Sequence, residues 1–215
     1  MDYKKLLKAH QLYYDKGGEG VRYYDEYMKH KDWRSWENPQ LPPIEIMKLF
    51  GFVLSWDAHF EGVPEKFKQI YQEIYPAIQN LGQERIENIN LGEEAIRKNI
   101  WEVFDKVARC SRKFESTDAS KILHTILPNL FVMWDRKIRE KILGDEAVMR
   151  GVDYADYFLP KMQREINEAI TSCMAENNLT YEKPILRISQ MADGKTLAKL
   201  IDEFNWVQYA LGERI

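Results

Sequence analysis

The sequence predicts an all-α protein, and three observations lead to that class. Apolar residues recur at helical spacing through most of the 215 residues. No convincing pair of alternating apolar and polar segments joined by a hairpin turn interrupts that pattern. Hydrophobic residues make up 45% of the chain, which is enough to bury a core. We therefore expect about eight to ten helices in one compact unit covering residues 1–215.

Each expected helix follows from its apolar stripe and from the residues that flank it. The glycines of KGGEG (16–20) end the first helix, and Pro42 or Pro43 starts the one after the second. Pro76 should kink or end the helix in which it stands, and Gly144 is a plausible stop. The expected helices cover about residues 3–14, 21–33, 44–56, 64–79, 93–110, a short stretch up to Pro128, a stretch after Asp135, 161–177, 184–191 and 196–205.

Composition and charge exclude several classes of function. The net charge is −3, so the strongly basic balance of a non-specific DNA coat is absent, although a local basic face remains compatible with a DNA enzyme. The four histidines and two cysteines show no metal-ligand spacing, and an iron–sulphur cluster would need four cysteines. We therefore expect no cofactor and no metal. Without a signal peptide or a membrane-spanning apolar run, we expect an intracellular, cytoplasmic protein that does not bind membranes.

One stretch, KILHTILPNLFVMWDRKIR (121–139), raises a specific question. Asp135 stands between an apolar crossing, NLFVMW (129–134), and a basic, helix-forming run. The simpler interpretation is a helix N-cap, because Asp accepts hydrogen bonds from the amides of a first helical turn. The functional interpretation uses the same geometry. A rigidly held carboxylate with one oxygen pointing outward can stabilise a developing cation or orient a water molecule.

Lys121 is the second candidate in this stretch, and it too has two interpretations. It follows the capping cluster STDAS (116–120), which places it near the start of the preceding helix. It is an ordinary solvated lysine, or else a nucleophile whose neutral amine is favoured by the helix N-terminus and by partial burial.

Residues 112–141 resemble the core of the helix-hairpin-helix (HhH-GPD-like) DNA glycosylases, as a divergent member of that superfamily. Asp135 matches the family Asp, Lys121 the family Lys, and Lys137 the phosphate-contacting position after the Asp. The family hairpin usually carries a Gly-x-Gly turn, whereas this chain has the glycine-free KFESTDAS (113–120). The resemblance implies a two-lobed helical fold, with about residues 21–150 in one lobe and 1–20 plus 151–215 in the other.

The activity that the resemblance implies is cleavage of an N-glycosidic bond in DNA. The enzyme would flip a nucleotide out of the stack, and Asp135 would stabilise the oxocarbenium-like sugar. Attack by water would only release the base, whereas attack by Lys121 would form a Schiff base and allow AP-lyase strand cleavage. The base is damaged or carries a modification, including a bulky one of viral origin, so repair and antiviral defence both stay open. We expect a monomer that acts on DNA in the nucleoid.

Two further sets of residues are candidates for contacts with DNA. The expected DNA-binding residues are Lys137, Arg136, Arg112, Lys113, Ser116 and Thr117. The candidates for the base pocket are Trp33, Trp36, His124 and Trp206, although core packing is the commoner role for each. Basic residues on either side of Asp135, including Arg109, Arg139 and Lys141, would form a rim around it. The alternative function is a non-catalytic helical adaptor that binds DNA or protein and retains the fold.

Overall fold

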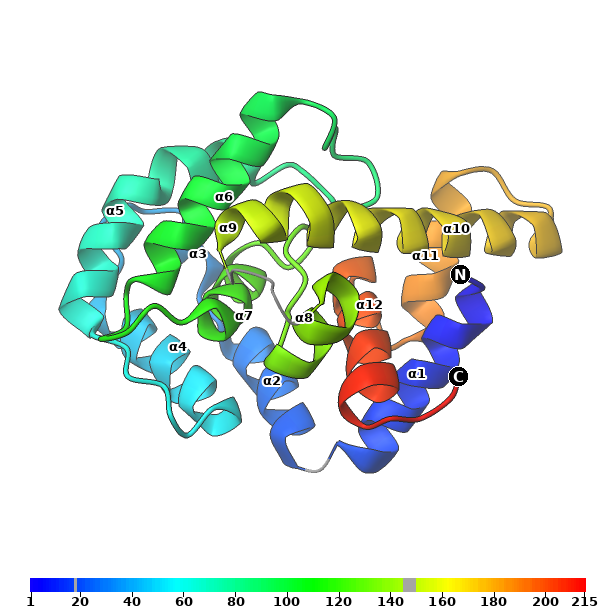
Figure 1. The fold of residues 1–215 in the computed structure, drawn as a ribbon, viewed down its shortest axis with the longest axis horizontal. Coiled ribbons are helices and arrows are strands. Elements are labelled where there is room, and N and C mark those ends of the chain that lie inside the picture. The colour runs from blue at the N-terminus through cyan, green and yellow to red at the C-terminus, as the bar shows by residue number, and fades with distance from the viewer. Residues whose placement is uncertain (18, 145–149) are drawn as a thin grey trace.

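The computed structural model describes residues 1–17, 19–144 and 150–215. The described part of the chain is folded into helices without any strand, and a lone bridge joins Gly62 to Ser111. The all-α prediction is therefore confirmed, and Figure 1 shows the helices packed around one another. Within these ranges, no helix is both long and apolar enough to cross a membrane.

The helix boundaries follow the predicted pattern closely. The described elements are α1 (Tyr3–Lys16), α2 (Glu19–His30), α3 (Trp33–Trp36), α4 (Pro43–Trp56), α5 (Pro64–Leu81), α6 (Glu94–Ala108), α7 (Ser116–Ile126), α8 (Arg136–Leu143), α9 (Gly151–Asp153), the π-helical turn η1 (Tyr154–Phe158), α10 (Leu159–Asn177), α11 (Glu182–Met191), α12 (Leu197–Asn205) and the π-helical turn η2 (Trp206–Ala210). The short segments α3 and α9 come in addition to the expected helices. As predicted, α4 starts at Pro43 and α8 ends at Gly144, whose φ of 89° suits glycine.

Pro76 does not end its helix, so of the two expected outcomes, a kink or an end, the second was wrong. Helix α5 continues through Pro76 to Leu81, over 18 residues. Pro76 lies on the exposed side of α5, where water can hydrogen-bond the carbonyl that the missing N–H leaves free. The buried stripe that includes Phe67, Ile74 and Ile78 continues on both sides of Pro76, so packing keeps the helix together.

The two ends of the chain meet in the fold. Helix α1 packs against α10, α11 and α12, so the first helix and the last three form one group beside the termini (Figure 1). The central helices form a second set of contacts, in which α6 packs against α5 and α7, and α4 packs against α2 and α7. Helix α8 packs against η1 and η2, and thereby connects the stretch after Asp135 with the end of the chain.

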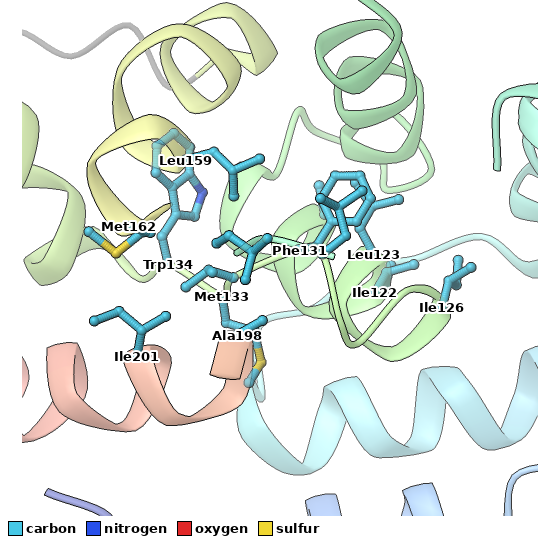
Figure 2. Close-up of a cluster of buried hydrophobic side chains, with 14 of the residues drawn as sticks. Ile122, Leu123, Ile126, Phe131, Met133, Trp134, Leu159, Met162, Ala198 and Ile201 are labelled. Atoms are coloured by element: carbon cyan, nitrogen blue, oxygen red, sulfur yellow. The ribbon is translucent and has the colours of Figure 1, made fainter. Parts of the chain in front are cut away.

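The crossing (129–134) lies in the core. Its apolar side chains are buried, from Leu130 through Trp134. Figure 2 shows Phe131, Met133 and Trp134 in a cluster with side chains of α7, α10 and α12. Burying one large apolar side chain contributes roughly 1.5–3 kcal/mol, so this run fixes the path of the chain into α8.

Candidate functional site

Asp135 is the N-cap of α8, as predicted. Its backbone is extended, with φ of −103° and ψ of 178°, and its Oδ1 accepts a hydrogen bond from the Ile138 N–H at 2.8 Å. Among the described residues, none donates a hydrogen bond to the second carboxylate oxygen, Oδ2. The side chain is half-buried and is held in place by the cap.

Side-chain hydrogen bonds hold the main chain just before Asp135. The Ser120 hydroxyl accepts from the Trp134 N–H at 3.1 Å and lies 3.2 Å from the Trp134 carbonyl. The Tyr154 hydroxyl accepts from the Val132 N–H at 2.8 Å and donates to the Val132 carbonyl at 2.7 Å. Because α7 and η1 satisfy these buried polar groups, the crossing needs no neighbouring strand, and the position of Asp135 is set from both sides.

His124 is fully buried and supports the same crossing. Its Nδ1 lies 2.6 Å from the Phe131 carbonyl, and its Nε2 lies 2.8 Å from the Tyr24 hydroxyl. The carbonyl can only accept, so Nδ1 carries the proton and Nε2 accepts from Tyr24. Complete burial lowers the pKa of His124 to about 3, which keeps the ring neutral. The prediction that His124 lines the base pocket is therefore corrected to a structural role.

Asp135 and Lys121 line the same cavity, which has a volume of about 300 Å³. This volume is at the lower end of the usual range for small-molecule sites. The cavity walls come from α1, α2, α4, α7, the crossing, α8, α12 and η2, so residues from both ends and from the middle of the chain meet there. Among the described residues, the charged side chains in its lining are Lys121, Asp135 and Asp202.

Aromatic rings form part of the cavity wall. Tyr13 and Trp206 meet edge to face, with ring centroids 5.3 Å apart and an interplanar angle of 89°. Trp56 donates its indole N–H to the Gly20 carbonyl and stacks on Tyr24, with centroids 5.8 Å apart. Rings fixed in this way give the cavity a rigid, largely apolar wall.

Lys121 is held by two carboxylates. Its Nζ lies 3.6 Å from Asp57 Oδ2 and 3.6 Å from Asp118 Oδ1, and the residue is only 9% exposed. Helix α7 begins at Ser116, so Lys121 lies in its second turn and the expected position near the helix start was wrong. The helix N-terminus is therefore not what controls this amine. The environment of Lys121 is set by Asp57 and Asp118.

Asp118 is an unusual carboxyl group. It is 3% exposed, and burial raises its pKa to about 6, partly offset by Lys121 and reinforced by Asp57 and Glu115. A carboxyl with such a pKa exists in both protonation states near neutral pH, beside an amine that lines the cavity.

Asp202 is the third charged group of the cavity, and sequence reasoning did not identify it. It is 6% exposed, and its Oδ2 accepts from the ammonium of Lys199 at 2.8 Å. Lys199 is 1% exposed and also lies 3.5 Å from Glu203 Oε1. Although burial lowers the pKa of Lys199, the two carboxylates raise it well above its usual value, so the ammonium stays charged.

The predicted base-pocket residues fall at different places. Trp206 lines the cavity of Asp135 and Lys121. Trp33 and Trp36 instead line a separate cavity beside Leu127 and Pro128, so the structure does not bring them to Asp135. The reason is local: both follow α2 in the short helix α3, and Lys31 lies over both rings, at 4.1 and 4.4 Å from their centroids.

The predicted DNA-binding residues are also divided. Arg112, Lys113, Arg136 and Lys137 are exposed, with Arg136 paired to Glu140 and Lys137 donating to the Ala210 carbonyl at 3.3 Å. Thr117 is half-buried.

Ser116 and Arg139 do not lie on an open basic rim, which corrects two expectations. Ser116 is 4% exposed, and its hydroxyl accepts from the Arg139 guanidinium at 3.1 Å. Arg139 is 5% exposed and lies over the Trp134 ring, 5.5 Å from its centroid. Both side chains are used to hold α7, α8 and the crossing together, because a buried guanidinium must find acceptors or a ring face.

Possible metal ligands and the two cysteines were located in the described ranges. Within them, no group of three or more His, Cys, Asp or Glu side chains is placed to hold a metal ion. Cys110 and Cys173 are both buried and free, and burial raises the pKa of each thiol.

Comparison of the chain with protein-family models, with curated proteins and with solved structures finds no match.

The residues that sequence reasoning missed belong mostly to the two ends of the chain. Tyr13 and Trp56 were expected only as parts of apolar helices, and Asp202 was not singled out within the helix expected at about 196–205. A usable signal existed in DEFNW (202–206), where Asp202 and Trp206 stand four residues apart and therefore on one helical face. An acid and an aromatic ring on one face of a mostly buried helix is the pattern of a cavity wall.

Proposed function

We propose that the protein is a DNA N-glycosylase that cleaves the N-glycosidic bond of a damaged or modified base. The observation that carries the proposal is the single cavity in which Asp135 and Lys121 meet aromatic side chains from separate helices. A carboxylate beside flat apolar walls suits an extruded nucleotide, because the base stacks while the sugar faces the charge. The likeness of residues 112–141 to the helix-hairpin-helix glycosylases agrees with this arrangement.

In the proposed reaction, Asp135 acts on the sugar. Cleavage of the C1′–N bond leaves positive charge on the sugar, and a fixed carboxylate at hydrogen-bond range lowers the energy of that state. The N-cap bond to Ile138 restrains one oxygen of Asp135 at 2.8 Å, which leaves the other for the substrate. Such preorganisation is effective because the carboxylate does not have to reorient during the reaction.

The nucleophile is water or Lys121, and the structure bears on the choice. Attack by Lys121 requires its ammonium to lose a proton while two carboxylates lie 3.6 Å away. Asp118 could take that proton, since burial raises its pKa to about 6. Attack by water needs no such step. We therefore propose base release by water, with Lys121 placing the substrate through its charge.

Asp135→Asn is the variant that tests the proposal. Asn caps helices about as well as Asp, so folding should persist, while base release should fall by about a hundredfold or more because the charge is lost. The measurement is mass spectrometry of bases released from genomic and viral DNAs that differ in their modifications. A covalent DNA adduct on Lys121 after borohydride treatment would change the nucleophile from water to lysine.

Asp2→Asn is the matched control. Asp2 caps α1 in the same way, accepting from the Lys4 N–H at 2.8 Å, and it does not line the cavity. It should leave base release unchanged. Undiminished release by Asp135→Asn would remove Asp135 from the mechanism.

The second candidate function is a non-catalytic helical adaptor that binds DNA or protein. The observation in its favour is the use of Ser116 and Arg139 in packing, because it weakens the expected basic rim. Failure of the folded wild-type protein to bind any DNA of the panel or to release a base from it would refute the glycosylase and support an adaptor that binds protein.

A further inference from the structure

The cavity holds a second carboxylate that the mechanism above does not use. Asp202 reaches it from α12, whereas Asp135 reaches it from the end of the crossing. The two negative charges interact, since Asp135 contributes to the raised pKa of Asp202. Lys199 bonds Asp202 Oδ2, and among the described residues none bonds the other oxygen, Oδ1.

The neighbours of Asp202 allow it to hold a proton at little cost. Lys199 is shared between Asp202 at 2.8 Å and Glu203 at 3.5 Å, so it keeps one carboxylate partner when Asp202 is neutral. Glu203 is itself fixed by the His10 ring, whose Nδ1 lies 2.7 Å from Glu203 Oε2. Because Lys199 keeps Glu203 and Glu203 keeps His10, protonation of Asp202 leaves neither of these two groups without a partner.

The charged and titratable groups that face Asp202 come from several elements. They are Lys199 and Glu203 on α12, Asp135 at the start of α8, Lys121 on α7, Tyr13 on α1, Tyr24 on α2 and Tyr154 in η1. Burial raises the pKa of Asp202 to about 6, Lys199 opposes that shift, and Glu203 and Asp135 add to it. A protonated fraction therefore exists at and below neutral pH.

We infer that Asp202 is the proton donor to the leaving base, an inference that rests on the proposed glycosylase activity. The carboxylic acid of Asp202 gives its proton to a ring nitrogen or oxygen of the base. The C1′–N bond breaks and its electron pair stays on the base nitrogen. Water adds to C1′ of the sugar cation, and the proton that it loses goes to Asp135. The products are the free base and the abasic sugar, and exchange with solvent restores both carboxyl groups.

Asp135 and Asp202 have the same side chain but different roles in the proposed reaction. Asp135, capped and half-buried, faces the developing positive charge as a carboxylate. Asp202, 6% exposed and competing with Glu203 for Lys199, supplies the proton. Such a division is how two carboxyl groups in one site act as acid and base at the same pH.

The test uses single-turnover base release as a function of pH, on whichever DNA the wild-type protein acts in the genomic and viral panel. Wild-type release should fall about tenfold per pH unit above about pH 6, where Asp202 loses its proton. Asp202→Asn should be slower by about a hundredfold at about pH 6 and should lose this dependence. Asp202→Glu should retain it. Glu203→Gln should move it to lower pH, because Lys199 is then left with Asp202 as its carboxylate partner.

Carbon-13 NMR of the Asp202 carboxyl group provides a readout that needs neither the substrate nor a destabilised variant. In the wild-type protein its titration midpoint should lie near 6, and Asp135→Asn should lower that midpoint by removing a negative charge.

The outcomes separate the two proposals. No base release by the wild-type protein refutes the glycosylase, and the role of Asp202 with it. Active wild type together with an Asp202→Asn variant that keeps its rate and pH dependence refutes the role of Asp202 alone. If Asp202→Asn does not fold, the pH dependence of Asp202→Glu and the NMR titration midpoint of Asp202 test its role instead. A midpoint near 4 would refute the assignment of Asp202 as the proton donor.

Discussion

Lys31 and Lys199 are buried lysines that lie in two regions with different chemistry. Lys31 is 6% exposed and Lys199 is 1% exposed. Both ammonium groups lie over aromatic rings, Lys31 at 4.4 Å from the centroid of Trp36 and Lys199 at 4.3 Å from that of Tyr13. Lys31 and Lys199 therefore have similar aromatic neighbours but different hydrogen-bonding and charged partners.

Those partners give the two amines opposite pKa shifts. Lys31 donates to the Thr125 carbonyl near the end of α7, and burial lowers its pKa to about 7. Lys199 bonds Asp202 at 2.8 Å, and its carboxylate neighbours raise its pKa despite burial. Ring faces thus do not replace a carboxylate for a buried cation. Of these two lysines, only Lys199, beside the Asp135 cavity, keeps a permanent charge.

The largest effect should come from removing that permanent charge. Lys199→Met leaves Asp202 and Glu203 buried without their ammonium, which should cost roughly 3–5 kcal/mol of unfolding free energy. Urea denaturation measures it, with Lys31→Met as the comparison. If Lys199→Met and Lys31→Met lost the same unfolding free energy, the carboxylates around Lys199 would not make its region different from that of Lys31.

Lys31→Met should have a smaller effect on the free energy of unfolding, and that effect should depend on pH. The pKa of Lys31 is about 7 in the folded protein against 10.5 for the usual lysine, so the unfolded chain binds more protons between these values. The contribution of Lys31 to stability should therefore rise as pH increases from about 7 to about 10.5, and below about 7 its burial penalty is complete. Denaturation midpoints of wild type and variant across this range measure the slope. Parallel curves would contradict the lowered pKa.

The smallest effect should come from Trp33→Leu. The ring of Trp33 lies 4.1 Å from the Lys31 ammonium, and a cation–π contact contributes about 0.5–1 kcal/mol. Only a charged Lys31 makes that contact, so the loss should be greater at about pH 6 than at about pH 9. The apolar contribution of the ring is the same at both pH values, so it cancels when the stability loss at about pH 9 is subtracted from that at about pH 6. A loss independent of pH would mean that Trp33 only packs against the lysine.

Much of the fold could be predicted because it depends on local signals. Helical stripes, Pro43 at a helix start, Gly144 at a helix end and Asp135 as an N-cap are each set by a few neighbouring residues. Lys121 was placed too close to its helix start, because STDAS resembles a cap but is itself helical. Ser and Thr hydroxyl groups can form hydrogen bonds both in a cap before a helix and within its first turns, so helix propensity alone does not decide where this helix begins.

The cavity could be predicted only in part, because its walls come together through long-range packing. Asp135 and Lys121 are close in sequence, and their joint position followed from one short segment. Asp202 joins them only because α12 packs against α1 beside η2 and α8, which no local pattern reveals. The presence of an acidic residue at position 202 also did not point to a cavity, since acidic side chains on helices are usually exposed to solvent.

The crossing has a consequence for protein engineering. Its carbonyl and amide groups are matched by Ser120, His124 and Tyr154, which stand on other elements than the crossing itself. The short peptide that ends in Asp135 is therefore not a portable unit. Grafting it onto another helical scaffold would carry over the carboxylate but leave its partners behind. A designer who wants this carboxylate at the same place must transfer two helices along with it, each in its original register.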